Sequence, residues 1–464
     1  MTTDQNYQQI YRVGGMLDAG FVGQITYTIS LDQVYDELDI HFSFDKRLYS
    51  ESDVTPELID RLQTLCTAKY NAPTYPAEEF RQTILHEMKT EIHTMAELND
   101  NFIGCIHRQL TDRHMLYTKE FTSDGCLAQD TFSGVLKVTV LVFNVLLDNT
   151  QYTLTVSGHP VGQGVIAPNF NLMDTVKTAA GNAGASNAAG SADNSCEAES
   201  APASAVATAG SSGVSGAGSA ATAGDSSTTG SSSAGNTVTA STRFKRLELH
   251  NHTVESDGSL TCQELTEYLA ADHVDAFAIT DHNTTSGQKK IEQLLEEKHY
   301  PISLIRGMEY TTYFGHILCL NLAKYVPWNS IDQHRPELLF EAAREKGALV
   351  GIAHPFSYGD PFARGCRFEM TISDYSKVDF IEIFNNPEPL HEVNERGTNL
   401  WMSLIFSGYQ ITATSGMDLH NRAKLAGCYA TYIEGKNGGN IASELDTAIP
   451  VSYTHLTLPT IYSV

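Results

Sequence analysis

The sequence is poor in basic residues. Its 464 residues include 30 lysines and arginines against 55 aspartates and glutamates, which gives a formal charge of −25. Such a chain repels a phosphate backbone, so we expect no binding of duplex nucleic acid. A small phosphate ester is still compatible with this charge, because a local metal ion or cationic group can bind it.

Long apolar runs and paired cysteines are also missing. The most apolar run, GVLKVTVLVFNVLL, is interrupted by Lys137 and is too short to cross a bilayer, so it predicts a buried strand. The start, MTTDQNYQQIYRV, lacks the order of a signal peptide. The eight cysteines form no CxxC pair, which argues against a disulfide framework or a zinc ribbon. We therefore expect a cytoplasmic protein with no membrane partner.

A segment made almost wholly of Gly, Ala, Ser and Thr divides the chain. Residues 166–242 cannot bury enough apolar area to offset the entropy of ordering them, so they predict a disordered linker. Residues 1–165 predict a small α+β domain whose role the sequence does not indicate. Residues 243–450 alternate strands with helices, which predicts an α/β domain with a parallel sheet or barrel.

Two local patterns stand out in the first domain. Five apolar residues recur at helical spacing and predict one amphipathic helix: Phe80, Ile84, Met88, Ile92 and Met95. His86 and His93 lie on this predicted helix without the i, i+4 spacing of a metal pair, so we assign them to a solvated face. The stretch VTVLVFNVLLDNTQYTLTV predicts a β-hairpin about Asp148–Asn149.

The last residues do not continue the pattern of the α/β domain. The stretch VSYTHLTLPT follows the predicted helix ASELDTAI without an evident link to it. One choice of codons for this stretch looks like a transposase-based sequencing adapter. We therefore interpret residues 451–464 as an assembly artefact, and we expect the barrel to lack its final elements.

Histidines and carboxylates gather where the predicted strands of residues 243–450 end. They are His250, His252 and Asp257, then Asp281 and His282, then Glu309 and His316, then His354, and finally Asp418 and His420. In α/β barrels the reactive groups lie at the C-terminal ends of the strands, so we expect these side chains to converge.

The residue types in this set suit a metal centre. Neutral imidazole and carboxylate are ligands for Zn²⁺, Mn²⁺ or Fe²⁺. A carboxylate such as Glu309 can bridge two cations about 4 Å apart, and clustered cations provide hydroxide near neutral pH. One histidine at a strand end is usually an ordinary polar residue or a helix cap. The whole set in one domain is what predicts metal binding.

At these residues the chain resembles the PHP (polymerase and histidinol phosphatase) superfamily, nearest its CehA/McbA-like branch. The matching stretches are LELHNHTVESDGS, AITDHN, GMEYTTYFGHILCL, GIAHP and ATSGMDLHN, within residues 243–449. The resemblance implies a distorted (β/α)7 barrel with three divalent metal ions, Zn, Mn or Fe.

The resemblance also implies a ligand set. The first ion would be held by His250, His252, Glu309 and Asp418, the second by Asp257, His282 and Glu309, and the third by His316, His354 and His420. Asp281 would orient one of these ligands.

Substrate contacts are less clearly marked. Arg364, Arg367 and Arg422 lie near candidate site loops and could grip a phosphate, although ordinary surface positions fit them equally well. Glu382 and Asn385 end another strand, where a substrate contact and simple packing or capping are both open.

These residues lead us to expect a hydrolase, a PHP-type metal-dependent phosphoesterase. A metal-bound hydroxide would attack the phosphorus of a small phosphomonoester or nucleotide. Two alternatives stay open. A CehA-like enzyme would direct the same hydroxide at a carboxylic or carbamic ester, and a binding module would use the metals only as a scaffold.

Overall fold

The fold is described from a computed structural model. It describes residues 7–161, 175–178, 242–332, 334–385, 391–425 and 427–451. Most of the predicted linker lies outside these residues, as does the predicted artefact after Val451. Within the linker range, Thr175–Thr178 form strand β8, which pairs with the start of β2.

The elements fall into two groups along the chain. The first contains β1 (Gln8–Leu17), β2 (Gly23–Phe44), α1 (Pro56–Tyr70), α2 (Ala77–Glu87), β3 (Glu91–Leu98), β4 (Asn101–Ile106), β5 (Asp112–Tyr117), β6 (Phe132–Asn144), β7 (Thr150–Pro160) and β8. The second contains β9 (Thr242–Glu248), α3 (Cys262–Ala271), β10 (Ala276–Ile279), α4 (Ser286–Lys298), β11 (Ser303–Thr312), β12 (Gly315–Leu320), α5 (Glu337–Arg344), β13 (Leu349–Ile352), η1 (Tyr375–Lys377), β14 (Phe380–Asn385), α6 (Glu392–Phe406), β15 (Thr412–Gly416), β16 (Thr431–Lys436) and α7 (Ile441–Val451). Across the described ranges, no helix has the length and apolar character needed to span a membrane.

The first group builds an antiparallel sheet around the long strand β2. The order is β1-β7-β2-β6-β3-β4, and β5 and β8 also pair with β2. The first half of β2 pairs with β6, and its second half pairs with β7 and β5. The predicted hairpin about Asp148–Asn149 is therefore wrong, because β6 and β7 form their ladders with β2 and, among the described residues, none with each other.

The predicted amphipathic helix is shorter than expected. Helix α2 ends at Glu87, Met88 is already extended, and β3 begins at Glu91. Strand β3 forms ladders with both β4 and β6, and these tertiary hydrogen bonds override the helical spacing of the apolar residues. His93 is consequently a fully buried strand residue, so its assignment to a solvated helix face is wrong.

The second group forms a nearly closed, barrel-like sheet in the order β15-β14-β13-β12-β11-β10-β9-β16. The ladders β9–β10–β11 and β13–β14–β15 are parallel, whereas β12 is antiparallel to both neighbours. The Thr431 hydroxyl accepts from Ser415 N at 2.9 Å and lies 3.1 Å from Ser415 O, to which it donates, and these hydrogen bonds link the two ends of the sheet. The domain is thus mixed α/β, and the ladders do not confirm the (β/α)7 detail, since β11 turns directly into β12 without a helix.

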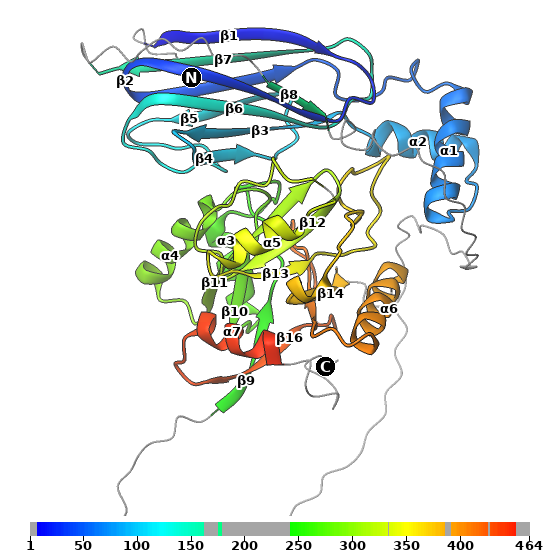
Figure 1. The fold of residues 1–464 in the computed structure, drawn as a ribbon, viewed down its shortest axis with the longest axis vertical. Coiled ribbons are helices and arrows are strands. Elements are labelled where there is room, and N and C mark those ends of the chain that lie inside the picture. Colours follow the sequence, from blue (N-terminus) through cyan, green and yellow to red (C-terminus); the bar gives the residue numbers. More distant parts are fainter. Residues whose placement is uncertain are drawn as a thin grey trace, which may run out of the picture.

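The antiparallel sheet covers one end of the barrel-like sheet, with β3 and β4 nearest to it (Figure 1). The two parts share one hydrophobic cluster, in which Leu141 and Phe143 of β6 pack with Tyr313 and Ile317. The Tyr313 hydroxyl also donates to the carbonyl of Gly23 at 2.7 Å. The antiparallel sheet is therefore held on the barrel-like sheet by a continuous apolar core and by specific hydrogen bonds.

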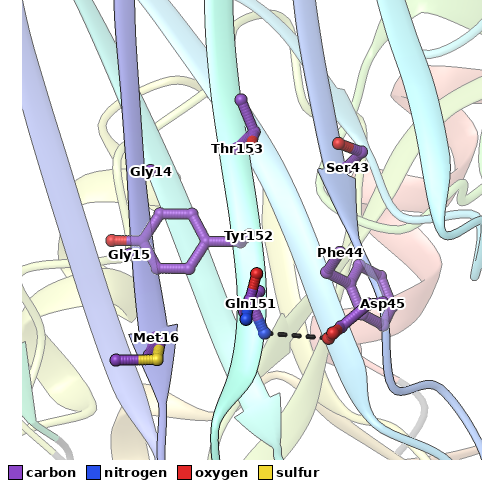
Figure 2. A pocket seen from close by; sticks show the side chains of 9 residues that line it. All are labelled: Gly14, Gly15, Met16, Ser43, Phe44, Asp45, Gln151, Tyr152 and Thr153. Atoms are coloured by element: carbon purple, nitrogen blue, oxygen red, sulfur yellow. Dashed lines mark hydrogen bonds between the residues drawn. The ribbon is translucent and has the colours of Figure 1, made fainter.

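A surface hollow of about 660 Å³ lies on the antiparallel sheet, where β1, β2 and β7 run side by side (Figure 2). The Tyr152 ring lies against Gly15, and the Gln151 backbone N–H donates to Asp45 at 2.8 Å. None of the predicted metal ligands lines this hollow. The chemistry that the sequence predicts has to be sought at the end of the barrel instead.

Candidate metal centre

The two histidines of HNH follow β9, which ends at Glu248. Their backbone is fixed by the late loop: Leu419 N donates to His250 O at 3.1 Å, and His252 N donates to Leu419 O at 2.8 Å. The pair therefore lies beyond the end of the strand, and both rings contribute to one group of ligand atoms. Both side chains are fully buried.

Glu309 lies at the centre of the group. Its Oε2 faces His250 Nε2 at 3.2 Å and His282 Nδ1 at 3.0 Å. Its Oε1 faces His316 Nδ1 at 2.9 Å and His354 Nε2 at 3.0 Å. The two oxygens of one fully buried carboxylate thus face two sets of imidazoles, which is the arrangement a bridging ligand needs.

His250, His252, Glu309 and Asp418 form one compact set of ligand atoms. Asp418 Oδ1 lies 2.9 Å from His252 Nε2 and 3.4 Å from His250 Nε2. Despite these short distances, four ligand atoms of the set are buried without a hydrogen-bond partner: His250 Nε2, His252 Nε2, Glu309 Oε2 and Asp418 Oδ1. Buried polar atoms without partners are costly, so a set of them around one point fits a bound cation.

Asp257, His282 and His420 gather beside this set, together with His252. His420 Nε2 lies 3.3 Å and His282 Nε2 3.7 Å from Asp257 Oδ1. The side chains of Asp257, Asp418 and His420 are 26%, 22% and 35% exposed, whereas Glu309 is fully buried. The site is therefore accessible from the side of these three residues.

His316 and His354 lie on the opposite side of Glu309, each next to its Oε1. His420 lies beside Asp257, and Asp418 lies 3.9 Å from His354 Nε2 and 3.5 Å from His420 Nδ1. The grouping of His316, His354 and His420 around a third ion stays a prediction. His354 has φ 26° and Asp418 has φ 50°, conformations that cost energy for residues with a side chain. Strain of this kind is concentrated at functional sites.

Glu382 is the main site residue that the ligand pattern did not single out. Its carboxylate accepts from His250 Nδ1 at 3.0 Å and from the His354 backbone N–H at 3.0 Å. This contact turns His250 Nε2 toward Glu309, as carboxylate–histidine pairs do at metal sites. Asn385 donates to Glu382 at 2.9 Å, so its buried amide supports this carboxylate. The sequence signal for Glu382 was the position of IEIFNN at the end of another predicted strand. This position alone is weak evidence for a role in the site.

Asp281 is fully buried and holds the loop that carries His252 and Asp257. It accepts hydrogen bonds from Thr253 N at 2.7 Å, Thr253 Oγ1 at 2.8 Å and Ser256 Oγ at 2.7 Å. Burial raises the pKa of Asp281 to about 6, against the effect of these donors. Its contacts are with the ligand loop and not with a ligand side chain.

The three arginines considered for phosphate binding have partners within the protein. Arg364 pairs with Asp360 at 2.8 Å, and Arg367 lies over the rings of Tyr70 and Phe356. Arg422 lies over the ring of Tyr268. Their role toward a substrate stays a prediction.

The antiparallel sheet adds a residue that no sequence pattern indicated. His107, which follows β4, stacks on His282 with ring centroids 4.1 Å apart. Its Nε2 lies 3.3 Å from Asp257 Oδ2. His107 is distant in sequence from every motif of the barrel, so only the docking of the two sheets reveals it.

The charges in the cluster depend on one another. Burial alone would raise the pKa of Glu309, but His250, His316 and His282 hold it well below its usual range. Burial, together with His282 and His420, lowers the pKa of His252 to about 3. Glu309 and His252 are thus in the forms that bind metal ions. Against the effect of burial, Glu382 and Glu309 raise the pKa of His250, so an ion that binds there displaces a proton.

Known proteins resemble separate parts of this chain. Residues 7–160 match the model of a family of unknown function (DUF6669). An uncharacterized protein of Methanocaldococcus jannaschii is 30% identical over 112 residues, which are 24% of this chain and 58% of that protein. A 5'-3' exoribonuclease of Haemophilus influenzae is 36% identical over 141 residues, 29% of this chain and 50% of that enzyme. The chain thus spans about half the length of these curated relatives.

A solved two-domain protein of Bacteroides vulgatus, which contains a predicted PHP-like metal-dependent phosphoesterase, overlaps 44% of this chain and 63% of its own. The identity is 18% and the TM-score is 0.33. An overlap at this score does not establish a common fold, so the function has to be argued from the site itself.

Proposed function

We propose that the protein is a metal-dependent hydrolase that cleaves a phosphate ester. One observation carries the proposal: ligand atoms of His250, His252, Glu309 and Asp418 lie 2.9–3.4 Å from their neighbours and have no hydrogen-bond partner. Bound divalent ions would supply an activated water and would neutralise charge on a phosphoryl group. We infer Zn, Mn or Fe, up to three ions, from the mixture of imidazole and carboxylate ligands.

The residues of the chain would divide the work. Glu309 would join two groups of imidazoles through its two oxygens, and Glu382 would keep His250 in the orientation for binding. Asp281 would hold the loop of Asp257 in place. The substrate would approach from the partly exposed side of the site.

The substrate is inferred from the relatives and from the charge of the chain. The curated relatives named above include a 5'-3' exoribonuclease, which supports a phosphate ester over a carboxylic ester. The net charge of −25 and the contact of His107 of the antiparallel sheet with Asp257 and His282 favour a small phosphomonoester, a nucleotide or the end of a single strand over a duplex. A carboxylic or carbamic ester and a non-catalytic scaffold are kept as outcomes of the test.

The test uses the full chain loaded with Zn²⁺, Mn²⁺ or Fe²⁺. Four substrates would be compared: an aryl phosphate monoester, a diaryl phosphate diester, a 5'-phosphorylated oligoribonucleotide and an aryl carboxylic ester. We expect hydrolysis of a phosphate substrate, and a fall in kcat/KM of about 10²-fold or more in Asp418→Asn. His86→Asn, at an exposed histidine on α2, is the matched control and should be fully active.

Hydrolysis of the carboxylic ester alone would replace the proposal by an esterase function. A folded, metal-loaded protein that is inactive on all four substrates would favour the scaffold. Equal activity of Asp418→Asn and the unchanged protein would mean that hydrolysis takes place elsewhere.

A further inference from the structure

The antiparallel sheet carries its own group of buried metal-ligand side chains. Glu91 and His93 lie on β3, two residues apart and therefore on one face of the strand. His107 follows β4, which pairs with β3 through Thr94 and Ile106. The ladder thus brings the rings of His93 and His107 to a centroid distance of 4.0 Å.

The atoms of this group are close enough to share one ion. One ligand atom from each of Glu91, His93 and His107 lies within 4.8 Å of the others. Glu91 Oε1 and His93 Nε2 are 3.2 Å apart. Ligands about 2.1 Å from a tetrahedral zinc ion lie about 3.4 Å from one another, so this spacing needs little adjustment.

The group is removed from water. Glu91, His93 and His107 are only 7%, 0% and 5% exposed, so the Glu91 carboxylate is removed from water. Nδ1 of His93 and Nδ1 of His107 are buried without a hydrogen-bond partner. Phe143 lies 4.5 Å from the His93 ring and forms an apolar wall. The Nε2 atom of His93 faces Glu91 and also lies 3.0 Å from Gln109 Nε2, so a metal ion bound there would replace the contact with Gln109 and neutralise the buried carboxylate.

We propose that Glu91, His93 and His107 bind one divalent transition-metal ion on the antiparallel sheet, in addition to any ions held by the barrel. Two imidazoles and one carboxylate leave a fourth position open, a ligand set that suits Zn²⁺. His107 also contacts Asp257 and His282 of the barrel, so an ion here would stiffen the contact between the two sheets.

The inference does not depend on the proposed hydrolase, and the test separates the two. The full chain is stripped of metal, incubated with Zn²⁺, dialysed, and analysed for bound zinc per chain. We expect Glu91→Gln and His93→Ala each to hold about one equivalent fewer than the unchanged protein. The difference is informative whatever number of ions the barrel holds, and Asp418→Asn should lower the count independently.

The control is His114→Ala, which removes an exposed group of His41, Asp112 and His114 that could also bind zinc. We expect the same zinc content as in the unchanged protein after dialysis. Circular dichroism of the metal-free variants checks that they fold. Anomalous diffraction of zinc-soaked crystals of the unchanged protein gives a second measurement, with a peak expected between Glu91 and His93.

Equal zinc content in Glu91→Gln, His93→Ala and the unchanged protein would overturn the inference, as would the absence of an anomalous peak. The group would then be a hydrogen-bonded network, in which Gln109 Nε2 already lies 3.0 Å from His93 Nε2.

Discussion

At the scale of single residues, the centre depends on carboxylates that do not face the proposed ions. Glu382 contacts the ring of His250 and the backbone of His354, and Asp281 makes three hydrogen bonds to the ligand loop. Each is fully or nearly fully buried. Their role is to fix the direction of the ligands, which matters because metal sites tolerate little misplacement.

Replacing Glu382 by Gln tests this role. The amide keeps the size of the side chain but loses the charge that stabilises the Nδ1–H of His250. We expect the affinity for the most tightly bound ion to fall about 10- to 100-fold, as measured by competition with a chelator. Glu296→Gln, at an exposed position of α4, is the control and should not change the affinity. Equal affinities in all three proteins would contradict a supporting role for Glu382.

At the scale of elements, the loop that contains Gly125 is one of the contacts between the first domain and the barrel. Gly125 donates its N–H to Glu255 at 3.1 Å, and its carbonyl accepts from Thr284 Oγ1 at 2.9 Å. Gly125 has φ 80°, and a Cβ there would lie 2.3 Å from the carbonyl oxygen of Cys105. Only glycine fits this position, because the conformation and the close approach both exclude a side chain.

Gly125→Ala should therefore loosen the contact between the two sheets. We expect unfolding free energy to fall by about 2 kcal/mol or more, as measured by urea denaturation. Gly408→Ala is a matched control, since Gly408 also has a positive φ of 93° but has open space around it. A loss in Gly125→Ala no larger than that in Gly408→Ala would show that the close approach to Cys105 and Glu255 has no energetic weight.

At the scale of the whole molecule, the antiparallel sheet and the barrel share one core. Phe143 and Leu141 pack in the same cluster as Tyr313, and α1 and α2 pack with Tyr358 and Phe362. Domains with a large apolar interface unfold together. We expect a single calorimetric transition for the full chain, and two separate transitions would contradict this view of the interface.

Removal of metal should weaken the whole molecule. Ligands that bind only the folded state stabilise it by mass action, about 4 kcal/mol at 1,000 times Kd. We expect a chelator to lower the Tm by several degrees, and added Zn²⁺ or Mn²⁺ to restore it. The same treatment of Asp418→Asn should produce a smaller shift. An unchanged Tm after verified loss of metal would mean that the bound ions do not stabilise the folded state, which would contradict this prediction.

The sequence by itself determined the local features of this protein. The order of strands and helices after residue 242 and the position of His250 and His252 beyond the end of a strand follow from patterns only a few residues long. Such patterns carry this information because backbone hydrogen bonding and side-chain periodicity are local.

Contacts between distant segments were decided only by the tertiary structure. The spacing of Phe80 to Met95 is helical, yet ladders with β4 and β6 make β3 a strand and bury His93. The same docking brings His107 to Asp257, and the barrel places His420 beside Asp257. Such placements depend on pairing between residues far apart in the chain, which no local period encodes.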